Sequence, residues 1–306
     1  MSAGHGHSHG TVTGQHRTRL IIVIGLTLST FVVQVIGGLL SGSLALLADA
    51  GHMLTDSTGL LIALVATLLA ARPATAQRTY GLQRAEVLAA LANALLLVGV
   101  AVWVLLRAID RWNEPVEISS GLMLAVAVVG AVVNTIGLLV LRQGQQQSLN
   151  LRGAYLEVLG DLLGSLAVII AALVIMFTGF TRIDSIASLA IFVMIIPRAW
   201  SLLKDVVGVL LEETPPGVDL DEVRQHMSDI PGVVGVHDLH AWTITSGMPV
   251  LSAHVVVDDA WMTSGRSGEV LDQLGDCLGA HFDLEHCTFQ VEPQGHLAHE
   301  HAEPHP

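Results

Sequence analysis

Ionisable side chains recur at helical spacing inside two apolar stretches of the chain. Asp49, His52 and Asp56 stand at positions i, i+3 and i+7 of the first stretch, which places them on one face of a helix. Glu157 and Asp161 stand at positions i and i+4 of the second stretch and also share one face. Two such helices side by side would bring one imidazole and three carboxylates together. Four nitrogen and oxygen donors are the number that a tetrahedral Zn²⁺ takes.

The apolar setting makes these residues candidates for function. A charged side chain at the middle of a bilayer costs about 3 kcal/mol or more. Clustered carboxylates there repel one another and take up protons, and a divalent cation removes both problems. A single carboxylate of this kind is as often a packing or proton-relay residue, but two matched sets in separate stretches favour a metal site. We expect His52, Asp56, Glu157 and Asp161 as the ligands of that site, and Asp49 as an accessory or hydrogen-bonding residue nearer the outer side.

The composition is that of a membrane protein. Hydrophobic residues make up 52% of the 306, charged residues 13%, and the mean hydropathy is +0.61, whereas soluble domains carry about a quarter charged residues. Six stretches reach the roughly 20 apolar residues that a membrane span needs: 18–40, 44–71, 84–108, 119–141, 153–178 and 183–204. The predicted fold class is therefore a membrane α-helical domain of six transmembrane helices, followed by a cytoplasmic α+β domain.

Basic residues set the orientation, because cytoplasmic loops are enriched in Lys and Arg. With the N-terminus inside, nine basic residues fall on the cytoplasmic side: Arg17, Arg19, Arg72, Arg78, Arg84, Arg142, Arg152, Arg198 and Lys204. Three fall outside: Arg107, Arg111 and Arg182. The even number of spans then puts both termini in the cytoplasm of a multi-pass protein of the cell (inner) membrane.

From residue 212 onward the chain is strongly acidic, with 17 Asp and Glu against two Arg. This excess argues against nucleic-acid binding, which needs a basic surface. A helix is expected from about Asp219, strands at 233–244 and 250–257 joined by a turn at 246–247, a helix at 267–280 and a strand at 286–292. We divide the chain into a His-rich tail (1–16), the transmembrane domain (17–211), the α+β domain (212–293) and a second His-rich tail (294–306).

Four segments carry a resemblance to a known family, the cation diffusion facilitators. GSLALLADAGHMLTD at 42–56 resembles the second helix of that family, and TYGLQRAEVL at 79–88 resembles the start of its third helix. NLRGAYLEVLGD at 150–161 is similar to its fifth helix, and VHDLHAWTIT at 236–245 to its cytoplasmic domain. The resemblance covers about residues 17–293 and is strongest to the bacterial zinc, cobalt and cadmium efflux branch.

The resemblance implies a homodimer with a ferredoxin-like cytoplasmic domain that exports a divalent metal ion in exchange for protons by alternating access. By motif position, it carries His52, Asp56 and Asp161 over as transport ligands. Zinc members usually read His-x-x-x-Asp in the fifth helix, whereas this chain has Glu157 before Asp161. The added carboxylate makes the site harder, which should ease the passage of Mn²⁺, Fe²⁺ or Co²⁺. Zn²⁺ stays the first choice of substrate, with Mn²⁺, Fe²⁺, Co²⁺ or Cd²⁺ as the alternative.

Further metal ligands are expected in the cytoplasmic parts. By resemblance, His237, His254 and Glu292 match positions that bind regulatory metal in relatives, and His286, His240 and His281 are further candidates. Gln290 stands where some relatives have a histidine, and lone surface histidines are often only solvated. The two ends add a dispersed set suited to weak metal capture: His5, His7, His9, His16, His296, His299, His301 and His305.

Two other classes of function were weighed. An intramembrane metalloenzyme would need a water-activating base beside its ligands, as in a His-Glu-x-x-His motif, and the sequence has none. We therefore expect no enzymatic activity. A metal sensor or scaffold that signals through the acidic domain without transport is the remaining alternative, and metal-dependent dimerisation of that domain without flux would favour it.

Overall fold

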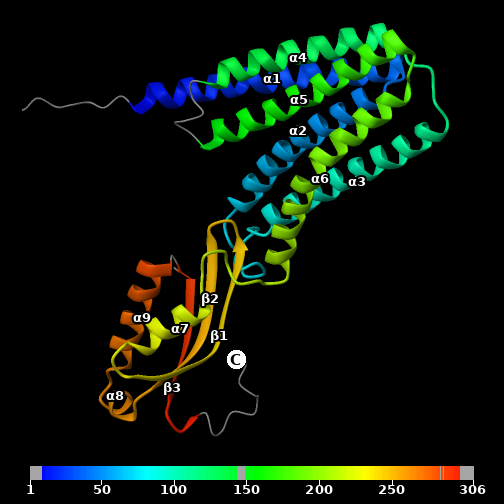
Figure 1. Ribbon diagram of the computed structural model, residues 1–306. Helices are drawn as coiled ribbons and strands as arrows, with labels where there is room; N and C mark the ends of the chain where they lie inside the picture. Colours follow the sequence, from blue (N-terminus) through cyan, green and yellow to red (C-terminus); the bar gives the residue numbers. More distant parts are fainter. Residues whose placement is uncertain (1–8, 143–148, 283, 285, 297–306) are drawn as a thin grey trace, which may run out of the picture. The chain divides into compact units, whose positions relative to one another are not determined.

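The computed structural model describes residues 9–142, 149–282, 284 and 286–296 of the chain (Figure 1). The chain separates into two compact units. One contains Met1–Leu64 and Ala92–Leu203, and the other contains Val65–Leu91 and Lys204–Pro306. Much of both expected His-rich tails, including His5, His7, His299, His301 and His305, lies outside the described residues.

Six long helices make up the first two thirds of the chain: α1 (His9–Ser41), α2 (Leu44–Ala70), α3 (Ala85–Asn113), α4 (Ser120–Arg142), α5 (Leu149–Thr178) and α6 (Arg182–Leu210). Within the described residues, five of them are long and apolar enough to cross a membrane, namely α3, α4, the 152–178 part of α5, α6, and α1 from Ile22. The helix outside this set, α2, has 27 residues and carries Asp49, His52 and Asp56. Helix α1 begins earlier than the expected stretch 18–40, and α6 ends later than the expected stretch 183–204.

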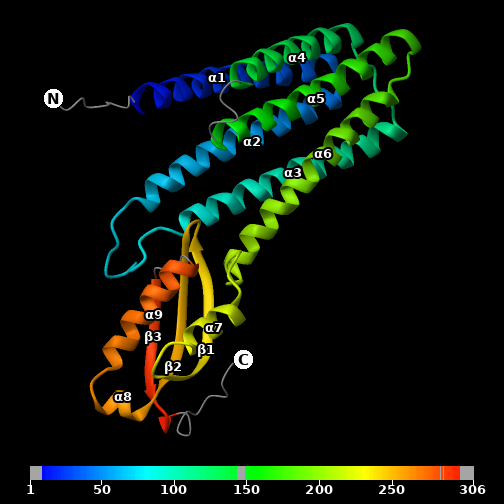
Figure 2. The ribbon, with the colours of Figure 1, turned by 60° about the vertical axis from the view of Figure 1, so that its left-hand side comes forward.

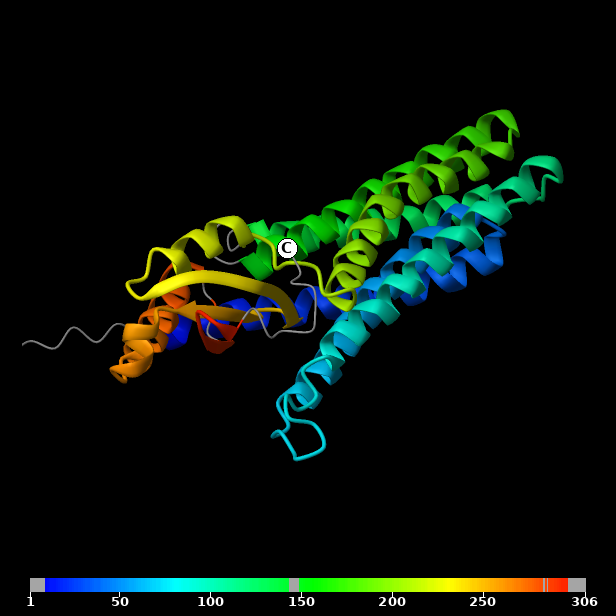
Figure 3. The ribbon, with the colours of Figure 1, turned by 90° about the horizontal axis from the view of Figure 1, so that it is seen from below.

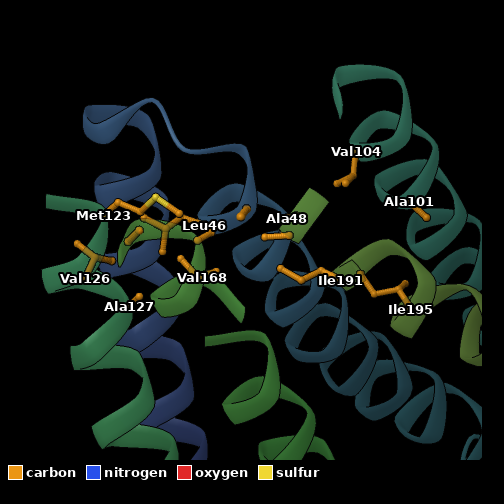
Figure 4. Close-up of a cluster of buried hydrophobic side chains, with 14 of the residues drawn as sticks. Leu46, Ala48, Ala101, Val104, Met123, Val126, Ala127, Val168, Ile191 and Ile195 are labelled. Atoms are coloured by element: carbon orange, nitrogen blue, oxygen red, sulfur yellow. The ribbon is translucent and has the colours of Figure 1, made fainter. Parts of the chain in front are cut away.

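The first unit is held by small and branched side chains that α2 to α6 contribute to one buried cluster (Figure 4). Leu46, Met123 and Ile195 are each at most 1% exposed. Helix α4 packs against α1 and α5, which lie along it in both Figure 1 and Figure 2. At Gly37 in α1, an added Cβ would collide with Val126 of α4, so this crossing requires a residue without a side chain.

A buried carboxylate fixes the start of α2. Asp184 of α6 is 1% exposed and accepts hydrogen bonds from the backbone N–H groups of Leu44 (2.7 Å) and Ala45 (3.2 Å) and from the Ser43 hydroxyl (2.6 Å). The guanidinium of Arg111 in α3 lies 3.3 Å from the same carboxylate. The first N–H groups of a helix have no partner within it and favour negative charge. Asp184 therefore joins α2, α3 and α6 at one point.

The acidic C-terminal part folds as an α+β domain, as expected. Helix α7 (Leu220–Ser228) begins after Asp219, whose carboxylate accepts from the N–H groups of Asp221 and Glu222. Strands β1 (Val233–Thr245) and β2 (Met248–Val257) form the long antiparallel hairpin seen in Figure 3. Helix α9 (Ser267–Phe282) leads to β3 (His286–Pro293), which pairs with β2 in parallel. A short helix that the sequence analysis did not anticipate, α8 (Asp259–Thr263), precedes α9.

The two faces of the three-stranded sheet, ordered β1-β2-β3, differ in character. On one face, α7 and α9 bury Met227 and Leu274 against strand residues such as Leu251. The opposite face carries His254 and Glu292. Asp238 has a φ of 46° at an irregularity of the β1–β2 register, and the register places His237 directly across from His254.

Replacing Asp184 with Asn should destabilise the protein and slow transport together, because the Arg111 guanidinium and the α2 N-terminus lose their buried negative partner. Breaking a buried ion pair costs about 3–5 kcal/mol. Thermal unfolding in detergent measures the loss, and Asp110→Asn is the matched control, since Asp110 forms only an exposed pair with Arg107 at 4.0 Å. Equal melting temperatures for the two variants would contradict the anchoring role.

Candidate metal sites

His52, Asp56 and Asp161 converge in the first unit. One ligand atom from each lies within 4.8 Å of the others, and Nε2 of His52 is 3.7 Å from Oδ2 of Asp56. Helix α2 supplies the first two residues at i, i+4 spacing, and α5 supplies the third. The two expected helix faces therefore meet, and three of the four expected transport ligands lie at one place.

Two atoms of this group are buried without a hydrogen-bond partner among the described residues. They are Nδ1 of His52 and Oδ1 of Asp161, and Asp161 is 3% exposed. A buried polar atom left without a partner costs about 1–3 kcal/mol. Coordination to a cation is one way to satisfy such atoms, and an imidazole with carboxylates is a donor set that divalent transition metals bind.

Glu157, the fourth expected ligand, pairs with a cation from another helix. Its Oε1 lies 2.7 Å from the Arg198 guanidinium of α6, which also reaches Oδ2 of Asp56 at 3.3 Å. Arg198 thus bridges one carboxylate of α2 and one of α5. Our sequence analysis counted Arg198 only among the orienting basic residues. Its position inside a long apolar stretch, where a charge needs a partner, was the signal that could have marked it.

A cavity of about 150 Å³ opens beside these residues. Its lining includes His52, Glu157 and Arg198, together with Gly160 and Gly164 of α5, whereas Asp56 and Asp161 are not among the lining residues. A water molecule occupies about 30 Å³ in the liquid. The space is therefore large enough for an ion with part of its water shell.

Asp49, the expected accessory residue, is engaged elsewhere. It is 1% exposed, and its Oδ2 accepts a hydrogen bond of 2.7 Å from the Gln34 amide of α1. A Cβ at Gly164 would collide with the Asp49 carboxylate, so this glycine makes room for it. Asp49 lines the cavity but is not in the group formed by His52, Asp56 and Asp161.

A second group lies on the face of the cytoplasmic sheet opposite α7 and α9. Glu292 is 2% exposed, and its two oxygens lie 3.3 Å from Nε2 of His237 and 2.8 Å from Nδ1 of His254. The two imidazole rings meet edge to face, with centroids 4.9 Å apart. Gln290, across the ladder from His254, donates to Glu292 at 2.7 Å. Three of the expected cytoplasmic ligands thus come together.

The other expected cytoplasmic ligands lie apart from this group. His286 starts β3 across from Val250, and His240 is exposed on β1 opposite Ser252. His281 belongs to a third group with His226 and Cys277, two residues that the sequence analysis did not select. No local spacing links His226 to the other two, so only the packing of α7 on α9 brings them together.

Comparison with known proteins decides the family. Residues 20–211 match the cation efflux transmembrane domain, and residues 215–294 match the cytoplasmic domain of cation efflux proteins. The chain belongs to the cation efflux family. It is accordingly a multi-pass membrane transporter with a cytoplasmic C-terminal domain, and not an enzyme, which confirms the fold class and the type of function expected from the sequence.

Curated relatives of this cation efflux protein span nearly its whole length. It is 46% identical to the metal cation efflux system protein CzcD of Cupriavidus metallidurans over 95% of this chain and 90% of the relative. Identity is 42% to the zinc transporter ZitB of Escherichia coli, over 95% and 93%. It is 36% to a cadmium, cobalt and zinc/H⁺–K⁺ antiporter of Bacillus subtilis, again over 95% and 93%.

If Asp56 and Glu157 bind the transported ion, Arg198→Gln should raise the apparent affinity for it, because the guanidinium would compete with the ion for both carboxylates. The fall in half-saturating metal concentration should be several-fold, measured by initial flux into proteoliposomes. Arg182→Gln, whose guanidinium contacts the Trp112 carbonyl at 3.0 Å, is the control on the same helix. An unchanged or raised half-saturating concentration in Arg198→Gln would exclude competition.

Proposed function

We propose that this cation efflux protein exports Zn²⁺ from the cytoplasm in exchange for protons, with His52, Asp56 and Asp161 as transport ligands and Glu157 joining them when Arg198 withdraws. The observation that carries the proposal is the convergence of an imidazole and two carboxylates from α2 and α5, two of whose buried atoms have no hydrogen-bond partner among the described residues. The names of the Escherichia coli and Bacillus subtilis relatives, a zinc transporter and a cadmium, cobalt and zinc/H⁺–K⁺ antiporter, include this ion and this counter-ion.

Proton exchange follows from the chemistry of the ligands. His52 binds metal only as neutral imidazole, and Asp56 and Asp161 bind it only as carboxylates, so ion and protons compete for the same atoms. On the side with higher proton activity, protonation releases the ion. On the cytoplasmic side, deprotonation restores the site. Alternating access then requires the α2/α5 pair to expose these ligands first to one side and then to the other.

Glu157 sets the range of ions. With Glu157 bound, the site has one nitrogen and three carboxylate donors, which is a harder set than two imidazoles and two carboxylates. Zn²⁺ binds such a site, but Co²⁺, Fe²⁺ and Mn²⁺ lose less by the exchange of imidazole for carboxylate. We therefore propose Zn²⁺ as the main substrate with Cd²⁺, Co²⁺, Fe²⁺ or Mn²⁺ as further candidates.

The cytoplasmic domain adds dimerisation and regulation to the proposal. Its family assignment favours a homodimer in the membrane. His237, His254 and Glu292 are proposed to bind a regulatory divalent ion on the sheet face. We also propose that the transmembrane domain begins at residue 17 and that the α+β domain extends from residue 212 to residue 293.

The site assignment predicts that the double variant His52→Ala, Asp161→Ala no longer moves Zn²⁺ under a pH gradient, because only one carboxylate of the converging group is left. Zn²⁺ flux into proteoliposomes with a fluorescent indicator inside measures this. The control is His286→Ala, which removes an exposed histidine outside the three groups. If the double variant, correctly folded, still transports Zn²⁺ at a comparable rate, the transport site lies elsewhere.

Glu157→His should shift selectivity toward Zn²⁺ and Cd²⁺ and away from Mn²⁺ and Fe²⁺. The physical reason is the exchange of a hard oxygen donor for a borderline nitrogen donor. The measurement is the ratio of Zn²⁺ to Mn²⁺ flux in the variant divided by that in the native protein, and we expect a change of about tenfold, or about 1.4 kcal/mol. A ratio that does not change means that Glu157 does not contact the ion.

A further inference from the structure

A thiol and two imidazoles meet where the last turns of two cytoplasmic helices pack together. His226 lies in the last turn of α7, and His281 lies in the last turn of α9, four residues after Cys277. One ligand atom from each of the three residues lies within 4.8 Å of the others. Neither the transport site nor the group on the sheet face includes any of them.

The distances suit a shared ion better than hydrogen bonding. Sγ of Cys277 lies 3.8 Å from Nδ1 of His226 and 3.8 Å from Nδ1 of His281. In a tetrahedral zinc site, with Zn–S near 2.3 Å and Zn–N near 2.05 Å, a sulfur and a nitrogen ligand lie about 3.6 Å apart. The imidazole rings of His226 and His281 also lie close together, with centroids 5.0 Å apart and planes tilted by 53°.

The surroundings hold the three side chains in place and favour a cation. Nδ1 of His281 also lies 2.9 Å from the Cys277 carbonyl oxygen, which restrains the ring, and an ion bound at this nitrogen would replace that hydrogen bond. Phe282 packs edge-on against the His226 ring at 5.2 Å. Both helices end at this point, and the carbonyl groups of a helix C-terminus carry partial negative charge. The core residues beside the group, Met227 and Leu278, are fully buried, so the helix pair that presents it is fixed.

We infer that His226, Cys277 and His281 form a further metal site of the cytoplasmic domain, which takes a borderline-soft divalent cation such as Zn²⁺, Cd²⁺ or Co²⁺. Thiolate and imidazole donors select these ions over Mg²⁺, Ca²⁺ and Mn²⁺. A cytoplasmic thiol remains reduced and available for binding. Three protein ligands leave one tetrahedral position to water, as in zinc sites that are not fully closed.

An ion in this site would cross-link α7 and α9. The two helices are far apart in sequence, and their packing covers one face of the sheet. Metal that binds the folded domain and not the unfolded chain stabilises the folded state, by an amount that rises with the logarithm of the free ion concentration once that exceeds the dissociation constant. The cross-link therefore couples the stability of the packed α7 and α9 helices to the cytoplasmic concentration of the ion. This coupling does not depend on the transport proposal.

Cobalt spectroscopy on the full-length protein in detergent, under reducing conditions, tests the inference. A Co²⁺–thiolate bond gives a near-ultraviolet charge-transfer band that imidazole and carboxylate ligands do not give. The chain has only two cysteines, Cys277 and Cys287, so the band has only two possible sources. We expect the native protein to show the band, Cys277→Ser to lose it, and added Zn²⁺ to abolish it by displacement.

Cys287→Ser is the matched control. The Cys287 thiol donates to the Leu284 carbonyl at 3.2 Å and belongs to none of the three ligand groups of the described residues, so this variant should keep the band. His226→Gln and His281→Gln should each weaken Co²⁺ binding at least about tenfold, since even the loss of an outer-shell partner commonly costs about 10–100-fold in metal affinity. Glu292→Gln, in the group on the sheet face, should leave the band unchanged.

Alkylation of Cys277 by N-ethylmaleimide gives a second readout that needs no band. Zn²⁺ should slow labelling of Cys277 at least about tenfold relative to Mg²⁺, with the labelled residue identified by mass spectrometry. If the native protein shows no charge-transfer band, if Cys277→Ser retains it, or if Zn²⁺ leaves Cys277 labelling unchanged, the three residues form a packing cluster and the inference is wrong.

Discussion

The contact between Asp184 and the start of α2 sets the level along the helices at which the proposed transport residues meet. A buried carboxylate is tolerated there because two backbone N–H groups of α2, the hydroxyl of the preceding Ser43 and the Arg111 guanidinium surround it. Helices α2 and α6 both begin at this contact. Asp56 follows Leu44 by 12 residues and Arg198 follows Asp184 by 14, which at 1.5 Å per residue is about 18 Å and about 21 Å. The two side chains therefore reach the same level, where they pair at 3.3 Å.

A charge in an apolar bundle needs a partner, and this requirement explains why Arg198 lies among the proposed transport ligands. Asp56, Glu157 and Asp161 would otherwise concentrate negative charge in a low-dielectric space. The Arg198 guanidinium neutralises part of that charge by pairing with Asp56 and Glu157, and it leaves the His52 imidazole free to bind an ion. Arginine is a suitable residue for this role because its charge is permanent and its planar fork reaches two carboxylates. In the proposed mechanism, a dication that binds here would displace the Arg198 guanidinium, which would limit how tightly the ion is held and so favour its release.

The sequence predicted what depends on local pattern. Helical spacing placed His52 with Asp56 on one face, and alternation with turn chemistry located β1 and β2 to within one or two residues. The engagement of Glu157 by Arg198 was missed because it depends on the rotation of α6 against α5, which hydropathy does not specify. The irregularity at Asp238, which brings His237 across from His254, was missed for the same kind of reason. His226 and Cys277 are separated by 51 residues, and no periodicity connects them.

The three groups of ligands differ in hardness, and the difference bears on how the protein discriminates among ions. The transport residues are mainly carboxylates, and a carboxylate-rich site separates Zn²⁺ from Mn²⁺ or Fe²⁺ poorly. The sheet-face group has two imidazoles and one carboxylate, and the proposed α7/α9 group has two imidazoles and a thiolate. The softness of the donor atoms thus increases from the proposed transport site to the sheet-face group and then to the proposed α7/α9 group. A transporter with a permissive transport site gains selectivity if the domain that responds to cytoplasmic metal responds to the softer ions. The thiolate of Cys277 is the donor that would give it that selectivity, because Mn²⁺ and Mg²⁺ bind thiolate poorly and Zn²⁺, Cd²⁺ and Co²⁺ bind it well.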